Sequence, residues 1–160
     1  MKDNIELSVI VPCLNEEENI FDALDILEKN LKGINHEVIV IDDQSGDNTV
    51  SRSQEWIENN NASNYHVLKK SLDRRGYGAV IKFGLAYATG KYVVFYSADM
   101  VDPIHLLPDM LEMVRKNDLV QVSRYQNPEN AKSIPFKYKF FQFFFRRCVR
   151  LALGSTVVDS

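Results

Sequence analysis

Acidic side chains follow two apolar runs of the sequence, at positions where a carboxylate could bind a nucleotide or a divalent cation. Asp42 and Asp43 come directly after residues 38–41, and Asp99 comes shortly after residues 92–96. A carboxylate can accept hydrogen bonds from a nucleobase N–H or from ribose hydroxyls, and Mg²⁺ is commonly held by carboxylates together with substrate phosphates. The alternative is structural, because the same residue types cap helices that follow strands.

The segment around Asp99 is a weaker metal motif than a pair of aspartates would be. An Asp-x-Asp pair after a strand could hold Mg²⁺ or Mn²⁺ against a diphosphate. The sequence here is Ser97-Ala98-Asp99, so the first position lacks a carboxylate, and Asp102 lies three residues further on. A helix-capping role for Asp99 is an equally good explanation of this segment alone.

The third predicted helix, residues 76–88, begins in a glycine-rich stretch, Arg74-Arg75-Gly76-Tyr77-Gly78. Glycine lets a backbone approach a ligand, and a helix N-terminus favours anions. The stretch is not a dinucleotide-binding fingerprint, because Ala79-Val80-Ile81 does not complete the GxGxxG pattern. Close packing of a helix on a sheet remains the structural alternative.

The segment 136–153 combines aromatic and basic side chains at helical spacing, with seven aromatic residues within 136–145. Such a helix suits a membrane interface with anionic headgroups, and a core or dimer helix with a basic solvent edge is the alternative. The apolar face would hold Phe136, Phe140, Phe141, Phe144 and Phe145, and the basic face Lys139, Arg146 and Arg150.

Alternating strand and helix patterns predict the framework that positions these residues. Continuous apolar strands alternating with helices indicate a mostly parallel sheet covered by helices on both faces. We expect Asn15 and Glu18 to form a capping box and Val50 and Ile57 to point inward. Ligands bind beyond the carboxyl ends of such strands. The predicted strands are 7–11, 38–41, 65–68, 92–96 and 119–122, and the predicted helices begin near residues 20, 47, 76, 103 and 136.

Composition restricts the class of protein further. The chain has 160 residues, 45% apolar and 26% charged, which are values of a single globular domain. Its net charge of −3 excludes a generally basic nucleic-acid binder. Residues 1–130 hold 13 basic and 21 acidic residues, whereas residues 131–160 hold six and one. Two distant cysteines and the lack of a signal peptide favour a cytoplasmic protein.

The motifs together resemble those of family 2 glycosyltransferases with the GT-A fold, and most closely the dolichol-phosphate mannose synthase-like branch. Such a fold is a three-layer, Rossmann-like α/β structure. The resemblance runs nearly from end to end of the chain. It is carried by residues 8–19 (SVIVPCLNEEEN), 37–49 (EVIVIDDQSGDNT), 75–79 (RGYGA), 88–92 (ATGKY), 98–99 (AD) and 123–125 (SRY).

The resemblance implies inverting transfer of a sugar from a GDP- or UDP-sugar to an acceptor, with a lipid phosphate as the expected acceptor. Asp99 would bind Mg²⁺ or Mn²⁺ at the donor diphosphate, and Arg124 would meet a phosphate. Lys137, Lys139, Arg146 and Arg150 are candidates for acceptor or membrane contact on the cytoplasmic face. The donor-binding set would comprise Pro12, Leu14, Glu16, Asp43, Arg75, Gly76, Ser97 and Ala98.

Two departures from the family pattern define an alternative. One metal-binding carboxylate is replaced by Ser97, and Val101 stands where the lipid-phosphate branch often has glutamine. We expect residues 1–130 to form the nucleotide-sugar-binding core, and residues 131–160 to add the basic aromatic helix and the start of a truncated acceptor segment within the same domain. An active enzyme could be a homo-oligomer. The alternative to an active enzyme is a degenerate or truncated nucleotide-binding domain.

Overall fold

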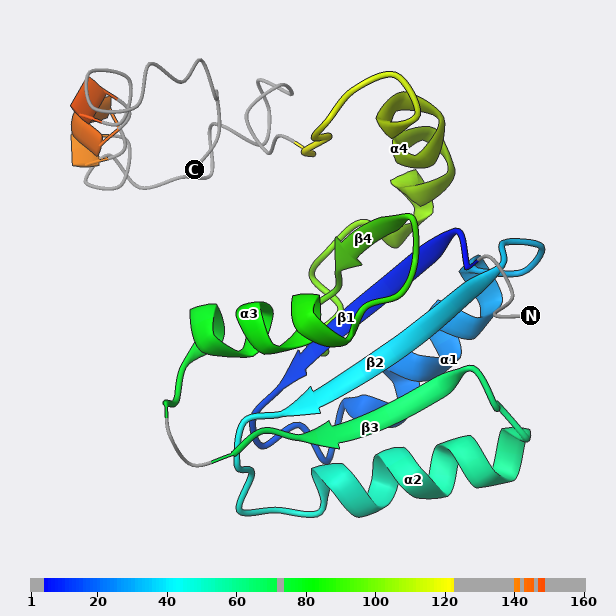
Figure 1. The fold of residues 1–160 in the computed structure, drawn as a ribbon. Helices are drawn as coiled ribbons and strands as arrows, with labels where there is room; N and C mark the ends of the chain where they lie inside the picture. Colours follow the sequence, from blue (N-terminus) through cyan, green and yellow to red (C-terminus); the bar gives the residue numbers. More distant parts are fainter. Residues whose placement is uncertain (1–4, 72–73, 123–139, 142, 146, 149–160) are drawn as a thin grey trace. The chain divides into compact units, whose positions relative to one another are not determined.

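The chain forms two compact units, residues 1–112 and residues 113–160. The first contains a sheet with helices, and the second contains a helical segment near residue 140 (Figure 1). A computed structural model describes the chain over residues 5–71, 74–122, 140–141, 143–145 and 147–148.

Parallel strands form the sheet of the first unit: β1 (Leu7–Cys13), β2 (His36–Asp42), β3 (Tyr65–Lys69) and β4 (Tyr92–Phe95). Their order across the sheet is β3-β2-β1-β4. β1 pairs with β2 on one side and with β4 on the other, so its backbone lies at the centre. All four strands run in the same direction, and their carboxyl ends therefore share one edge.

Helices cover both faces of this sheet, as Figure 1 shows: α1 (Ile20–Asn30) and α2 (Thr49–Asn60) on one face, and α3 (Tyr77–Tyr87) on the other. Alternate residues of the strands point to opposite faces. Val9 and Val38 pack in the larger core with α1 and α2, and Ile10 and Ile39 pack in the smaller core with Val80 of α3. The predicted three-layer α/β architecture is confirmed.

α3 approaches the sheet closely because it carries a glycine on its inner face. A Cβ atom on Gly84 would lie 2.6 Å from Cδ1 of Ile41 and 2.8 Å from Cγ2 of Ile10. Such contacts are too short for real Cβ atoms, so a larger residue would force these isoleucine side chains to shift. Gly76 and Gly78, for which close packing was the structural alternative, have nothing within 4 Å of an added Cβ, so close packing explains Gly84 and not this pair.

The inward face of α2 agrees with its prediction in part, because Ile57 packs against the larger core. Thr49, Ser53 and Trp56 are buried, whereas Val50 and Ile57 are only half-buried. Trp56 packs in the larger core, and its Nε1–H donates to Oδ1 of Asp25 on α1 at 2.7 Å.

The predicted strand at 119–122 is not formed, although these residues are described. Leu119 is 75% exposed. Among the described strands, β4 pairs with β1 alone. A strand exists only where a neighbouring backbone accepts and donates its hydrogen bonds, and a short apolar run does not specify that neighbour. After Pro103, a 3₁₀ turn (Ile104–Leu106) leads into α4 (Leu107–Val114), close to the predicted helix.

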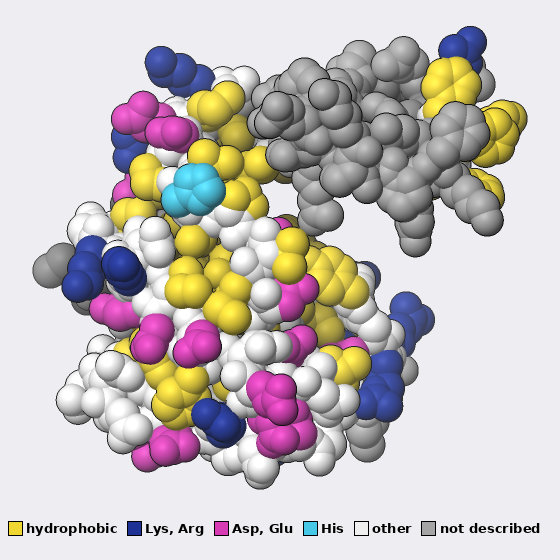
Figure 2. Space-filling model, turned by 180° about the vertical axis from the view of Figure 1, so that it is seen from behind, with side chains coloured by type: hydrophobic (Ala, Val, Ile, Leu, Met, Phe, Trp, Pro, Cys, Tyr) yellow, Lys and Arg dark blue, Asp and Glu magenta, His cyan; other side chains and the backbone are white. Residues whose placement is uncertain are grey.

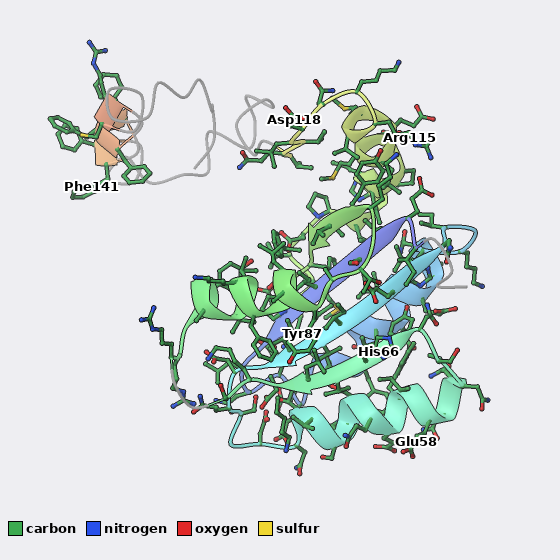
Figure 3. The ribbon with its side chains drawn as sticks, in the orientation of Figure 1. Glu58, His66, Tyr87, Arg115, Asp118 and Phe141 are labelled. Atoms are coloured by element: carbon green, nitrogen blue, oxygen red, sulfur yellow. The ribbon has the colours of Figure 1, made fainter. Side chains whose placement is uncertain are left out.

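The described residues between 140 and 148 are helical, in agreement with part of the predicted helix 136–153. Phe141 is 70% exposed, and Phe140, Phe143, Phe144 and Phe145 are exposed as well. Figure 3 shows Phe141 projecting away from its helical segment. Within the described part of the chain, no helix is long and apolar enough to cross a membrane.

Candidate functional site

The loops that follow β1 and β2 interlock at the carboxyl edge of the sheet. The Asn15 N–H donates to Oγ of Ser45 at 2.9 Å, and the Gly46 N–H donates to Oδ1 of Asn15 at 2.8 Å. Asn15 has a positive φ of 57°, which asparagine tolerates better than most residues. The predicted capping box is therefore wrong: α1 begins after Asn19, and the Asn15 side chain holds the neighbouring loop instead.

A second set of contacts continues this interlocking toward α2. The Glu16 N–H donates to Oγ1 of Thr49 at 2.8 Å, and the Glu17 N–H donates to Oδ2 of Asp47 at 3.1 Å. Oδ1 of Asp47 accepts from the Thr49 N–H at 3.0 Å. Asp47, rather than Asp43 or Ser45, thus stabilises the start of α2. Burial raises the pKa of Asp47, but hydrogen bonds from Thr49 and Glu17 outweigh it and lower that pKa.

Three predicted nucleotide-contacting residues lie around these loops. Leu14 is 48% exposed, while Pro12 and Glu16 are half-buried. Oε2 of Glu16 accepts from Nδ2 of Asn19 at 2.8 Å, which orients its carboxylate. The exposed Leu14 side chain offers an apolar surface beside polar loop atoms, a combination that suits a flat heterocycle.

Asp43 is held by protein groups from two other elements. It is 4% exposed, and its Oδ1 lies 3.1 Å from Nζ of Lys70, directly after β3. Its Oδ2 accepts a 2.7 Å hydrogen bond from the Gly76 N–H at the start of α3. Burial raises the pKa of Asp43, but the Gly76 N–H, Lys70 and Arg75 outweigh burial and lower that pKa. Asp43 is therefore an ionised carboxylate that joins β2, β3 and α3.

Arg75 and Gly76 lie at this junction, as the sequence predicted for the donor-binding set. Nη2 of Arg75 lies 2.9 Å from the carbonyl oxygen of Gln44. Gly76 has φ +108°, a conformation that L side chains rarely adopt. This conformation directs its N–H at the Asp43 carboxylate, so the glycine is required for the contact.

The loop after β4 carries the candidate metal ligand. Ala98 is buried, and Asp99 is exposed with its Oδ1 accepting from the Val101 N–H at 3.2 Å. Oδ2 of Asp102 accepts from the Ser97 N–H at 2.9 Å. Both aspartates therefore stabilise the loop locally, and Asp99 presents its carboxylate to solvent.

These carboxylates fit a divalent cation only as part of a larger ligand set. Among the described residues, no group of three or more His, Cys, Asp or Glu side chains could hold a metal ion. Mg²⁺ is typically bound by one or two carboxylates together with substrate phosphates and water. Asp99, with Asp102 nearby in sequence, is compatible with that arrangement.

The charges of the acidic loop affect two tyrosines, one at the start of α3 and one after β4. Burial raises the pKa of Tyr77, the first residue of α3, and the charges of Asp102 and Asp99 raise it further. The same causes, in the same order, raise the pKa of Tyr96, which follows β4. The charges of Asp99 and Asp102 thus act on Tyr77 at the start of α3, and the adjacent Gly76 N–H contacts Asp43.

Several predicted residues lie outside the described part of the chain, and the sequence prediction missed one residue of the site. Lys70 was not singled out, although it follows β3 just as Asp43 follows β2, and this shared position was the available signal. The predicted residues outside the described ranges are Arg124, Lys137, Lys139, Arg146 and Arg150.

Sequence comparisons give the family of the chain. A family model described as glycosyl transferase family 2 matches residues 8–158. A dolichol-phosphate mannosyltransferase of Pyrococcus furiosus is 30% identical over 138 residues, which cover 84% of this chain and 38% of the relative. A dolichyl-phosphate beta-glucosyltransferase of Dictyostelium discoideum is 35% identical over 127 residues, which cover 73% of this chain and 38% of the relative.

Solved structures confirm the GT-A fold. A mannosyltransferase from Pyrobaculum calidifontis, in complex with GDP-Man and Mn²⁺, is similar with a TM-score of 0.65 and 24% identity, over 78% of this chain and 38% of that one. Glucosyl-3-phosphoglycerate synthase from Mycobacterium tuberculosis, in complex with Mn²⁺ and UDP-glucose, has a TM-score of 0.56 and 26% identity, over 71% of this chain and 40% of that one.

The chain spans 38% of the length of the two curated relatives. Within that span, the motif order and the α/β fold agree with the family model. The chain belongs to glycosyl transferase family 2 and is related to its dolichol-phosphate sugar transferases.

Proposed function

We propose that this protein is an inverting glycosyltransferase that moves a sugar from a nucleotide-diphosphate sugar to a lipid phosphate. The observation that carries this proposal is that Asp43, which accepts from the Gly76 N–H at the start of α3, and Asp99, in the loop after β4, both follow parallel strands whose carboxyl ends share one edge of the sheet. That edge is where open parallel sheets bind ligands. The relatives named for dolichol-phosphate sugar transfer support the choice of acceptor.

The donor would bind across the interlocked loops and the start of α3. Pro12, Leu14, Glu16 and Asp43 are proposed to line the nucleotide pocket, with the exposed Leu14 against the base. Arg75 and the backbone of Gly76 would lie on the diphosphate side, since a helix N-terminus favours anions. The remaining donor-binding residues are proposed to be Ser97 and Ala98.

A divalent cation, Mg²⁺ or Mn²⁺, would be held by Asp99, and a bound cation would stabilise negative charge on the leaving diphosphate. Mn²⁺ accompanies the nucleotide sugar in both solved relatives described above. Asp102 is proposed to keep the loop in place through the Ser97 N–H, because one of its oxygens already accepts that bond.

The reaction requires little acid–base chemistry if the acceptor is a phosphate. An anionic phosphate oxygen would attack the anomeric carbon from the face opposite the leaving group. The bond from that carbon to the diphosphate oxygen would break, and its electron pair would leave with the nucleoside diphosphate. No strong general base is then needed, whereas a hydroxyl acceptor would require one. Arg124 is proposed to contact one of the phosphates.

Residues 136–153 are proposed to bring the protein to a membrane surface that contains the acceptor. Exposed phenylalanines and nearby basic residues suit an interfacial helix on anionic lipid. The cytoplasmic face of the membrane is the proposed location. Lys137, Lys139, Arg146 and Arg150 are the proposed headgroup or acceptor contacts.

A second candidate is a nucleotide-binding domain without activity of its own. Ser97 in place of a first metal-binding carboxylate favours it. Under this candidate, nucleotide binding persists and sugar transfer to a lipid phosphate is not measurable.

The test is a calorimetric titration of UDP, GDP and their common sugars, with and without Mn²⁺. We expect one nucleotide class to bind with metal dependence, and Asp99→Ala to abolish that dependence. Asp109→Ala, on exposed α4, is the matched control and should bind like the wild type. Metal-independent binding, or binding unchanged by Asp99→Ala, would contradict the metal role. Transfer to a polyprenyl phosphate then separates the enzyme from the inactive domain.

A further inference from the structure

Lys70 is a buried cation within the candidate donor site, and the proposed reaction assigns it no role. It is 7% exposed, and both it and Asp43 have side chains that are 5% exposed. Its backbone N–H donates to the carbonyl oxygen of Asp42 at 3.0 Å, so the lysine continues the pairing of β2 with β3. This backbone hydrogen bond holds the Lys70 main chain beside β2, so that its ammonium group lies within reach of Asp43.

The opposite side of Asp43 contacts the start of α3. The Gly76 N–H donates to Oδ2 at 2.7 Å, while Lys70 faces Oδ1 at 3.1 Å. Arg75 adds a bond to the Gln44 carbonyl oxygen in the same loop. Asp43 is therefore bonded on each side, by a cation after β3 and by a backbone N–H before α3.

Removing one partner of a buried ion pair is strongly destabilising, because the other partner is left as an uncompensated buried charge. If Lys70 were neutral, Asp43 would be a buried carboxylate with Arg75 as its remaining cation. Protonation of Asp43 would then become easier, and a protonated oxygen accepts the Gly76 N–H more weakly. The start of α3 would then lose the contact with Asp43 that holds it.

We propose that Lys70 is a positioning residue which, through Asp43, fixes the start of α3 in the donor site. The inference rests on the proposed function in one respect, that nucleotide sugars bind at this edge of the sheet. It does not require Lys70 to touch the substrate. Lys70 acts through Asp43 and Gly76, whose contact joins the loop after β2 to the start of α3.

The direct test is an NMR pH titration of the Gly76 amide in the full chain. The charged groups that face Asp43 are Lys70 from the end of β3 and Arg75 from the start of α3, and on the β1 side its N–H meets the Cys13 carbonyl oxygen. In the wild type, the amide signal should titrate below the ordinary aspartate range. In Lys70→Met, the midpoint should rise by about one pH unit or more, because an opposite charge has been removed.

Matched variants separate this role from general charge and folding effects. Lys69→Met removes the same charge from the adjacent exposed residue, and should leave the Gly76 midpoint unchanged. Lys70→Arg should restore it. If Lys70→Met alone does not fold, the double variant Asp43→Asn with Lys70→Met keeps the site neutral and close to its original shape. Its Gly76 amide should then show no titration at all.

Nucleotide binding supplies the functional readout. UDP or GDP with Mn²⁺ should bind Lys70→Met about tenfold or more weakly than the wild type, since a charge-assisted contact that orders the site is lost. The loss should grow as the pH falls, and Lys70→Arg should recover most of the affinity. A wild type that binds no nucleotide would contradict the proposed function, while the Gly76 midpoint still decides the role of Lys70. An unchanged midpoint in Lys70→Met would overturn the inference.

Discussion

Asp43 and Asp99 both follow strands at the same edge of the sheet, yet their surroundings give them different chemistry. Asp43 is 4% exposed and bonded by Lys70 and Gly76, whereas Asp99 is exposed. A carboxylate bonded on both oxygens can fix neighbouring backbone, and an exposed one remains able to exchange water for a cation. Burial therefore distinguishes a positioning carboxylate from a candidate metal ligand.

Glu37 provides a residue-scale prediction at the opposite edge of the sheet. Its Oε1 accepts from Oγ of Ser8 at 2.5 Å and from the Thr89 N–H at 2.7 Å. Burial raises the pKa of Glu37, but bonds from Ser8 and Thr89 and the charge of His66 outweigh burial and lower that pKa. This stabilisation is present above the unfolded pKa of about 4.3 and is lost as the pH falls through the folded pKa.

Glu37→Gln should accordingly lower the free energy of unfolding by about 1–3 kcal/mol at pH 7, and by less in acid. Urea denaturation at several pH values measures this. Glu58→Gln is the control, because Glu58 points into solvent from α2 (Figure 3) and should change little. If the difference in unfolding free energy between Glu37→Gln and the wild type stayed constant down to strongly acidic pH, Ser8 and Thr89 would not be stabilising the ionised carboxylate.

The two cysteines should differ sharply in reactivity. Burial raises the pKa of Cys13, and the charges of Glu16, Asp42 and Asp47 raise it further, while Cys148 is exposed. Because the thiolate is the reactive form, an aromatic disulfide reagent should modify one thiol in the native protein and two in denaturant. Cys148→Ser should leave no rapidly reacting thiol, and rapid reaction in that variant would contradict the burial of Cys13.

At the scale of elements, α3 should tolerate alanine at one glycine and reject it at another. Gly84→Ala would bring a Cβ within 2.6 Å of Ile41, which should cost about 1–3 kcal/mol of stability. Gly78→Ala meets nothing within 4 Å in the same helix and should stabilise by about 0.5–1 kcal/mol. Denaturation midpoints of the two variants measure the difference, and equal midpoints would mean that α3 does not lie close on β1 and β2.

The elements of the sheet were largely predictable, because continuous apolar runs and helical spacing specify them. Positions of Asp43 and Asp99 at one edge followed from the parallel order. The contacts of Asp43 did not, since the sequence cannot tell which of the neighbouring Lys69 and Lys70 turns inward. The run 119–122 has the composition of a strand, but a strand also requires a neighbour that local sequence does not specify.

At the scale of the whole chain, acidic and basic residues separate along the sequence. Residues 1–130 are acidic overall and residues 131–160 are basic. Figure 2 shows acidic side chains in several groups over the described part of one face. Anionic lipid repels acidic residues, so the proposed attraction to a membrane is assigned to the basic aromatic segment.

Vesicle binding tests this separation. A polarity-sensitive dye on Cys148, beside the exposed phenylalanines, should brighten with anionic vesicles at low salt and respond weakly at high salt. Phe141→Ser should weaken binding, and Leu85→Ser, an exposed apolar residue of α3, should not. Binding that ignores salt, or the absence of binding, would favour a packing or oligomer role for residues 136–153.

The position of β4 beside β1 has a consequence for how the chain acquires its structure. β2 and β3 each meet their neighbour across one intervening helix, whereas β4 must return past both to reach β1. Contacts between segments that are distant in sequence form late. Closing the longer loop between them costs conformational entropy before the new contacts can compensate for it. We therefore expect a nascent chain to assemble the Asp43 side early and to gain the Asp99 loop last, so that the two acidic positions come together only after β4 has paired with β1.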